Sequence, residues 1–79
     1  MLIKKTYGEL NPNDVIFFHG ALLILVDVWC FESNDGKTVI RFKTRPYNDN
    51  AVKLLGAFYA NGTYGGISSL PIECYIKGE

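Results

Sequence analysis

Residues 22–45, LLILVDVWCFESNDGKTVIRFKTR, carry the strongest structural signal in the chain. From Lys37 to Arg45, two sets of side chains alternate without a break. A strand directs successive side chains to opposite faces, so this segment is predicted to be a half-buried strand with a basic outer face. The inner set is Thr38, Ile40, Phe42 and Thr44, and the outer set is Lys37, Val39, Arg41, Lys43 and Arg45.

The segment just before it, residues 22–31, is apolar on both sides except for Asp27, and it predicts a second strand of the same hairpin. A two-residue Asp-Gly loop between the strands would place Cys30 opposite Arg41 and mix the two faces. A three-residue loop with Gly36 in the left-handed conformation pairs Cys30 with Ile40 instead. We choose this loop, with a bulge at Gly36, because the faces then agree.

The chosen register defines the outer face of the hairpin. Trp29 and Arg41 lie opposite each other and are expected to form a cation–π contact. Asp27 and Lys43 are expected to form a cross-strand ion pair. The remaining outer pairs are Phe31 with Val39 and Leu25 with Arg45.

An earlier strand, Val15 to Phe18, joins residues 21 onward through a tight His19-Gly20 turn. A two-residue loop pairs Phe18 with Ala21 and therefore brings one set of apolar side chains to the same side of the sheet. We predict this set to be the main core. It consists of Val15, Phe17, Leu22, Ile24, Val26, Val28 and Cys30.

The ends of the chain give weaker signals. Thr6 and Glu9 have the spacing of a capping box and predict one helical turn. Residues 11–14, Asn-Pro-Asn-Asp, predict a turn. The last strand is predicted over residues 71–77, with Ile72, Cys74 and Ile76 inward and Glu73, Tyr75 and Lys77 outward.

Residues 47–56 allow two interpretations. They could form one or two helical turns with Asn48 or Asp49 as N-cap and Gly56 after the last turn, or they could be extended. Further on, the dipeptide Asn61-Gly62 predicts a hairpin with Tyr59 facing Tyr64. The glycines at 65–66 are interpreted as turn or bulge residues.

The fold class that follows is mostly β, in a single small domain over residues 1–79. We expect a small antiparallel barrel or rolled sheet of four or five short strands, of SH3-like or OB-like size, with one short helix within 47–56 as an option.

Composition limits the function classes. The 79 residues contain 8 basic and 8 acidic side chains and have a net charge of zero. A neutral chain is a poor candidate for general duplex DNA binding, which depends on many phosphate contacts. Cys30 and Cys74 lack zinc-site spacing and are expected to be buried free thiols rather than a disulfide. Residues 1–9 lack a secretory apolar segment, so we expect a cytoplasmic protein.

No arrangement of residues points to catalysis. His19 is the single histidine and falls in a predicted turn, and no serine or cysteine has a base at a suitable spacing. We therefore expect no enzyme activity, no catalytic residue, no cofactor and no metal site.

Binding is the function class that remains. We expect a small accessory or inhibitor protein of phage type that binds a partner protein or a second copy of itself. The alternative is binding of single-stranded nucleic acid or a nucleotide through the Trp29 and Arg41 face, by base stacking and phosphate contacts. A merely solvated face, or one covered by the N-terminal segment or by residues 47–70, would also fit the pattern. The partner-binding candidates are Trp29, Phe31, Arg41, Lys43, Arg45, Leu23, Leu25, Tyr59 and Tyr64, with Ile16 and Phe18 extending the apolar surface.

Overall fold

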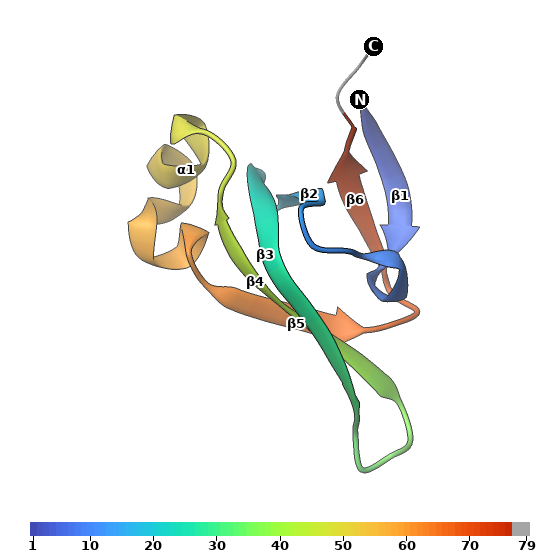
Figure 1. Ribbon diagram of the computed structural model, residues 1–79. Helices are drawn as coiled ribbons and strands as arrows, with labels where there is room; N and C mark the ends of the chain where they lie inside the picture. The colour runs from blue at the N-terminus through green and yellow to red at the C-terminus, as the bar shows by residue number, and fades with distance from the viewer. Residues whose placement is uncertain (77–79) are drawn as a thin grey trace.

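A computed structural model describes residues 1–76 as one antiparallel sheet of six strands, with one α-helix and a short 3-10 helix (Figure 1). The elements are β1 (Leu2–Thr6), η1 (Tyr7–Glu9), β2 (Val15–Phe18), β3 (Ala21–Glu32), β4 (Thr38–Pro46), α1 (Asp49–Ala60), β5 (Thr63–Ile67) and β6 (Pro71–Tyr75). Their order across the sheet is β1-β6-β2-β3-β4-β5. The predicted mostly β, rolled antiparallel sheet is confirmed.

The sheet curls until its two edges approach each other, but it does not close into a barrel. Contact between the edges is made through η1: the Tyr7 N–H donates to Leu70 O at 3.0 Å and the Gly8 N–H donates to Ser68 O at 2.9 Å. β1 and β5 themselves form no ladder. The inside of the roll holds the core, which consists of Leu10, Ile16, Ala21, Leu23, Leu25, Ile40, Phe42, Ala51, Ala60, Ile72 and Cys74.

The register of the first predicted hairpin is confirmed, and so is that of the second hairpin from Asp27 to the turn. Phe18 pairs with Ala21 across the first turn, where His19 and Gly20 both have positive φ, at 51° and 83°. A hairpin turn of two residues with this twist needs positive φ at both positions. In the second hairpin Trp29 pairs with Arg41, as predicted.

The second turn also has the predicted three-residue form. The Ser33 N–H donates to Lys37 O at 2.8 Å, and Gly36 has a φ of +80°. The Asp35 carboxylate accepts from the Ser33 hydroxyl and helps to hold the turn. Glycine suits the left-handed position because it has no Cβ to clash.

A β-bulge in β3 overturns the predicted core. Leu25 pairs with Thr44 and Asp27 pairs with Lys43, so Val26 is an extra residue on β3. Because side chains alternate, one extra residue exchanges the two faces on either side of it. The predicted pairing of Leu25 with Arg45 is therefore wrong, and Ile24 occupies that place.

The bulge reverses the inner and outer assignments before Val26. Leu23 and Leu25 are completely buried and share the inner side with Val28. The residues predicted as core on the other side are instead half-buried or exposed on the outside of the sheet. They are Val15, Phe17, Leu22, Ile24 and Val26.

Cys30 lies on the predicted inner side, opposite Ile40, but it is exposed, and the prediction of a buried thiol is wrong. The far part of the β3–β4 hairpin projects as an arm beyond the rest of the molecule (Figure 1). Thr38, also predicted to face inward, is exposed on the same arm. Inner-facing residues on the arm have no further layer to pack against.

The helix interpretation of the region after Pro46 is correct. α1 begins after Asn48, whose side chain accepts from the Ala51 N–H at 3.1 Å. Gly56 has a φ of 84° and interrupts the helix, which then continues to Ala60. The extended alternative is wrong, and so is the predicted Asn61-Gly62 hairpin, because Tyr59 lies in α1.

Gly65 and Gly66 are strand residues rather than turn or bulge residues. Both lie in β5 and pair with β4. A Cβ at Gly65 would lie 2.1 Å from the Ile40 carbonyl oxygen, and a Cβ at Gly66 would lie 3.1 Å from the Tyr7 ring. The two glycines therefore permit close approach of β5 to its neighbours.

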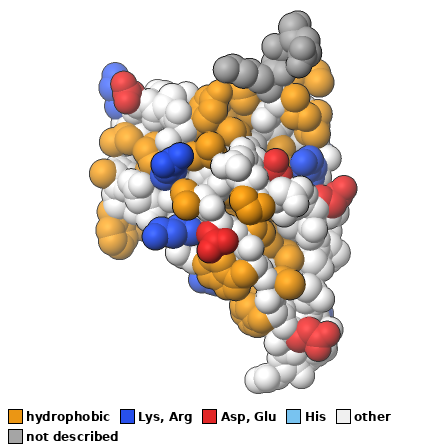
Figure 2. All heavy atoms as spheres, viewed as in Figure 1, with side chains coloured by type: hydrophobic (Ala, Val, Ile, Leu, Met, Phe, Trp, Pro, Cys, Tyr) orange, Lys and Arg blue, Asp and Glu red, His pale blue; other side chains and the backbone are white. Residues whose placement is uncertain are grey.

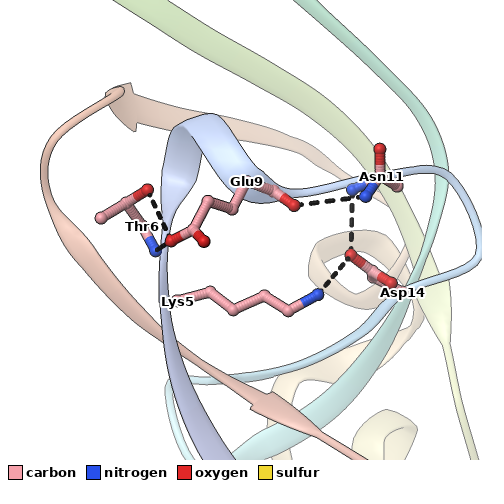
Figure 3. A network of polar contacts seen from close by, with 5 residues as sticks. All are labelled: Lys5, Thr6, Glu9, Asn11 and Asp14. Atoms are coloured by element: carbon pink, nitrogen blue, oxygen red, sulfur yellow. Dashed lines mark hydrogen bonds and ion pairs between the residues drawn. The ribbon is translucent and has the colours of Figure 1, made fainter.

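β1 is a strand that the sequence did not predict. Its inner side includes Lys5, so its alternation looks mixed. Lys5 can face inward because its ammonium lies 3.5 Å from the Asp14 carboxylate at the rim of the roll (Figure 3). The predicted capping box beside it is confirmed, since the Glu9 carboxylate accepts from the Thr6 N–H at 2.9 Å and from the Thr6 hydroxyl at 3.0 Å.

The remaining predictions concern residues 11–14 and the last strand. The turn is confirmed by a 3.1 Å bond from the Asp14 N–H to Asn11 O. Ile72 and Cys74 are buried as predicted. Ile76 lies after the end of β6 and is 43% exposed, so its inward prediction is wrong, while Lys77 falls outside the described residues.

Candidate binding surface

The side of the sheet that faces away from the core runs across all six strands, and we call the part of it on β1, β6, β2, β3 and β4 the outer face. The pairings place these residues in rows across it. It comprises Leu2 and Lys4 of β1, Glu73 and Tyr75 of β6, Val15 and Phe17 of β2, Leu22, Ile24, Val26, Asp27, Trp29 and Phe31 of β3, Val39, Arg41, Lys43 and Arg45 of β4, and Tyr47 next to β4.

Large apolar side chains are uncovered along the whole outer face. The exposed fraction is 43% for Trp29, 50% for Phe31 and 47% for Val26. Phe17 and Tyr47 are each 37% exposed at the other end of the face. In the space-filling view, hydrophobic side chains gather along β3 and toward β1 and β6, with charged side chains scattered among them (Figure 2). Exposed apolar patches of this kind are typical of interaction sites.

Two predicted members of this surface are not on it. Leu23 and Leu25 are fully buried, and so is Ile16, while Phe18 is partly buried against the core. The roll of the sheet and the buried Ala51 of α1 cover the side on which these residues lie. Cover by the chain itself, which the sequence left open as an alternative, therefore applies to Leu23 and Leu25 but not to Trp29 and Phe31, which stay exposed. Besides Trp29 and Phe31, the apolar part of the surface includes residues that the sequence placed in the core, namely Val15, Phe17, Leu22, Ile24 and Val26.

The basic residues of β4 are on the outer face, as predicted. Arg41, Lys43 and Arg45 follow one another at every second position, about 7 Å apart. Within residues 1–76 none of them forms an ion pair. The predicted pair between Lys43 and Asp27 is absent because the Asp27 carboxylate accepts from the Val28 N–H at 3.0 Å, beside the bulge. The three cations are thus available to an external partner.

The predicted cation–π contact between Trp29 and Arg41 is also absent from the part of the chain that the structure describes. The Arg41 side chain extends toward β5: a Cβ on Gly65 would lie 2.8 Å from its Cδ. The aliphatic part of Arg41 therefore rests on the glycine, and the Trp29 ring keeps a free surface.

Tyr59 and Tyr64 come together at a different place, the junction of α1 and β5. The Tyr64 hydroxyl donates to Tyr59 O at 2.5 Å. Together with Phe58, Asn61, Gly62 and Thr63 they line an open hollow of about 360 Å³. Phe58 is 82% exposed beside it. These two predicted site residues therefore belong to a separate patch and not to the outer face.

A second hollow, of about 300 Å³, lies next to the β2–β3 turn, and its lining includes Lys4, Tyr7, His19 and Glu73. His19 is exposed in the turn that the sequence predicted. Its ring packs edge-on against Phe18, with ring centroids 4.3 Å apart. Burial raises the pKa of the Tyr7 hydroxyl, so this phenol stays protonated. No hydrogen bond among the described residues links His19 to a nucleophile.

The cysteines are both free, but they differ in accessibility. Cys30 is exposed on the arm and Cys74 is buried in β6. Burial raises the pKa of the Cys74 thiol. Residues 1–76 contain no group of three or more His, Cys, Asp and Glu side chains placed to hold a metal ion. Over the same residues, no helix is long and apolar enough to cross a bilayer.

No protein-family model and no curated protein matches this chain. The residues of the outer face that the sequence missed are chiefly Leu2, Phe17, Val26, Tyr47 and Tyr75. Phe17 and Val26 were assigned to the core because a strand that is apolar on both sides does not reveal which side is covered. Tyr75 was predicted to face outward but was not named as a site residue.

Proposed function

We propose that this chain is a non-enzymatic binding module that holds a partner protein on the outer face of its sheet. The observation that carries the proposal is the exposure of Trp29 and Phe31, neighbours on one side of β3, beside Arg41, which forms no ion pair with any described residue. Trp and Arg dominate the energetics of protein interfaces when a partner excludes water from them.

The charges on the outer face indicate the chemistry of the partner. Its strands carry four basic residues, Lys4, Arg41, Lys43 and Arg45, and two acidic ones, Asp27 and Glu73. The surface that complements it has an apolar centre and acidic groups at the rim, because opposite potentials steer encounter and set orientation.

The accessory role and the cytoplasmic location expected from the sequence are part of this proposal. The free thiol of Cys30 is exposed, which suits a compartment that keeps thiols reduced. The exposed apolar and basic outer face suits an accessory or inhibitory role, because such a role requires only a binding surface.

The test is to identify a partner by photo-crosslinking from position 29 in the native cell and then to measure its affinity. We expect W29A/F31A to weaken binding by at least about 30-fold, since one interface hot spot is worth about 2 kcal/mol. The control is L54A, which removes a side chain that is 55% exposed on α1, outside the outer face. Equal affinities of the two variants would refute the outer face as the binding site.

Single-stranded nucleic acid is the second candidate, favoured by the line of Arg41, Lys43 and Arg45 beside two exposed aromatic rings. Sheets that bind single strands combine stacking aromatics with a basic track. Trp29 is the single tryptophan, so its fluorescence reports binding directly. This candidate predicts a change in emission with an oligonucleotide and an affinity that falls steeply with salt. Unchanged emission at low salt removes it.

A further inference from the structure

The two edges of the sheet differ in a way that the outer face does not explain. β1 carries Lys4 and Lys5, and lysines on an edge strand discourage pairing with another chain. β5 reads Thr-Tyr-Gly-Gly-Ile and lies within residues 54–72, which contain no charged side chain. It has no proline either, so it lacks both of these common protections of an exposed edge.

The hydrogen bonds of β5 show which of its backbone groups face the open edge. The Thr44 N–H donates to Gly62 O at 2.8 Å, and the Ser68 N–H donates to Thr38 O at 2.9 Å. The backbone N–H and C=O groups of the even-numbered residues therefore point toward β4. Alternate residues of a strand direct their backbone groups to opposite sides. Thr63, Gly65 and Ile67 therefore point away from β4.

η1 lies against one end of this edge, where the Tyr7 ring is beside Gly66 and the Gly8 N–H donates to Ser68 O. The outward groups of Thr63, Gly65 and Ile67 nevertheless have few hydrogen-bond partners among residues 1–76. No hydrogen bond joins Thr63 or Gly65 to any element on the open side. Ile67 O accepts from the Leu70 N–H at 3.0 Å, which leaves the Ile67 N–H open. An edge of unpaired backbone groups is a template for another strand.

We propose that two copies of this chain pair along β5 in antiparallel fashion to form a two-fold symmetric dimer. With Gly65 at the axis, the two copies of Gly65 exchange N–H···O bonds, and each Ile67 N–H reaches the Thr63 carbonyl of the other copy. A strand without charge meets its own copy without repulsion. The paired edge is then used up and the remaining β1 edges carry lysines, so assembly stops at the dimer.

The absence of a side chain on Gly65 fits this arrangement. The open side of Gly65 presents only backbone, while on its outer face Arg41 already lies close. Thr63 is exposed and Ile67 is half-buried, so the side chains that flank the axis are accessible to the other copy.

The proposal is tested by sedimentation velocity on the full chain over a range of concentrations. We expect a species of twice the 8.9 kDa chain mass that dissociates on dilution. Amide exchange should slow at Gly65 and Ile67 as the dimer forms. A chain that stays monomeric at every concentration overturns the proposal, and so does a dimer whose Gly65 amide stays unprotected.

A pair of charge variants tests the register. Thr63 lies opposite Ile67 of the other copy, so T63E/I67E places like charges opposite each other and T63E/I67K places opposite charges there. We expect T63E/I67E to dimerise about tenfold more weakly than T63E/I67K. Within the chain, Thr63 faces Lys43 and Ile67 faces Val39, so a Glu at 63 meets a cation in both variants. Circular dichroism confirms folding.

Equal dissociation constants for the two charge variants would overturn the Gly65-centred register. This test is separate from that of the proposed function, because W29A/F31A leaves the β5 edge intact and should dimerise like the natural chain. Loss of the dimer in W29A/F31A would place the contact on the outer face and not on β5.

Discussion

The two halves of β3 both carry apolar side chains on both sides of the strand, but they have different surroundings. In residues 21–25 the inner side chains Ala21, Leu23 and Leu25 are buried, and the outer side chains are half-buried. In residues 27–32 both sides are open, with Trp29 exposed on one and Cys30 on the other. The first half pairs with β2 and β4 and lies near α1, whereas the second half pairs only with β4. Burial of a strand thus depends on what lies around it more than on its own alternation.

The largest expected effect tests the change of surroundings at the bulge. Leu25→Ala removes a fully buried side chain and should lower the free energy of unfolding by about 2–5 kcal/mol. Val26→Ala, at the next position, truncates a side chain that is 47% exposed and should change stability by about 0.5 kcal/mol or less. Urea denaturation measures both. Similar losses for the two variants would contradict the assignment of the bulge to Val26.

A second variant tests the support that β5 gives to the base of the arm. Gly65→Ala forces a methyl group to within 2.1 Å of the Ile40 carbonyl oxygen, so β5 must move away from β4. We expect a loss of about 1–3 kcal/mol, as for overpacking elsewhere in proteins. Thr63→Ala is the matched control on the same strand, because Thr63 is exposed. Full stability of Gly65→Ala would mean that β5 and β4 are not held this closely.

The sequence predicted pairing better than burial, and the two halves of β3 show why. Gly20 and Gly36 lie in turns whose geometry sets the register of the residues next to them, so the first hairpin and the second as far as Asp27 were predictable. Which face of the sheet is covered was not predictable, because residues 15–18 and 21–26 are apolar on both sides. No glycine marks the bulge at Val26 in the sequence. A shift of one residue there exchanges the inner and outer assignment of every β3 residue before it.

The boundaries of α1 were predictable only in part. Asn48 caps the helix as expected, whereas Gly56 interrupts the helix without ending it, and α1 continues to Ala60. The hairpin predicted from Asn61-Gly62 is wrong because Asn61 is the C-cap of α1. Its side-chain amide donates to Ala57 O at 2.7 Å.

Two parts of the candidate site were predictable: the arm residues Trp29 and Phe31, and the basic residues Arg41, Lys43 and Arg45 of β4. In both segments the alternation of side chains is not interrupted by the bulge.

The two cysteines offer a smaller and purely local comparison of the arm with the roll. Cys30 should react with a thiol reagent in the native protein at close to the rate of a free thiol, because it is exposed. Cys74 should react only when the protein unfolds, since it is buried and burial raises its pKa. Timed labelling of C30S and C74S separates the two rates. Fast labelling of both sites would show that the roll opens as readily as the arm.

The smallest expected effect concerns two exposed carboxylates, one in the roll and one on the arm. Hydrogen bonds from the Thr6 N–H and then the Thr6 hydroxyl lower the pKa of Glu9 below its ordinary 4.5. The Ser33 hydroxyl, followed by the Lys37 N–H, lowers the pKa of Asp35 below its ordinary 3.8. A carboxylate with a lowered pKa in the folded state stabilises the fold fully above its unfolded pKa, and this contribution is lost as pH falls through the folded pKa.

The two carboxylates should nevertheless differ in their effect on global unfolding. Glu9 caps the turn through which the edges of the roll meet, so its protonation weakens a contact that breaks only when the whole sheet opens. Asp35 holds the tip of an arm that can fray by itself, and a locally opening segment contributes less to global stability. Thermal melts from pH 6 down to about pH 3 should therefore show a shallower acid decline for Glu9→Gln than for the natural chain, while Asp35→Asn keeps nearly the natural slope. A larger change of slope in Asp35→Asn would mean that the arm unfolds together with the roll as one cooperative unit.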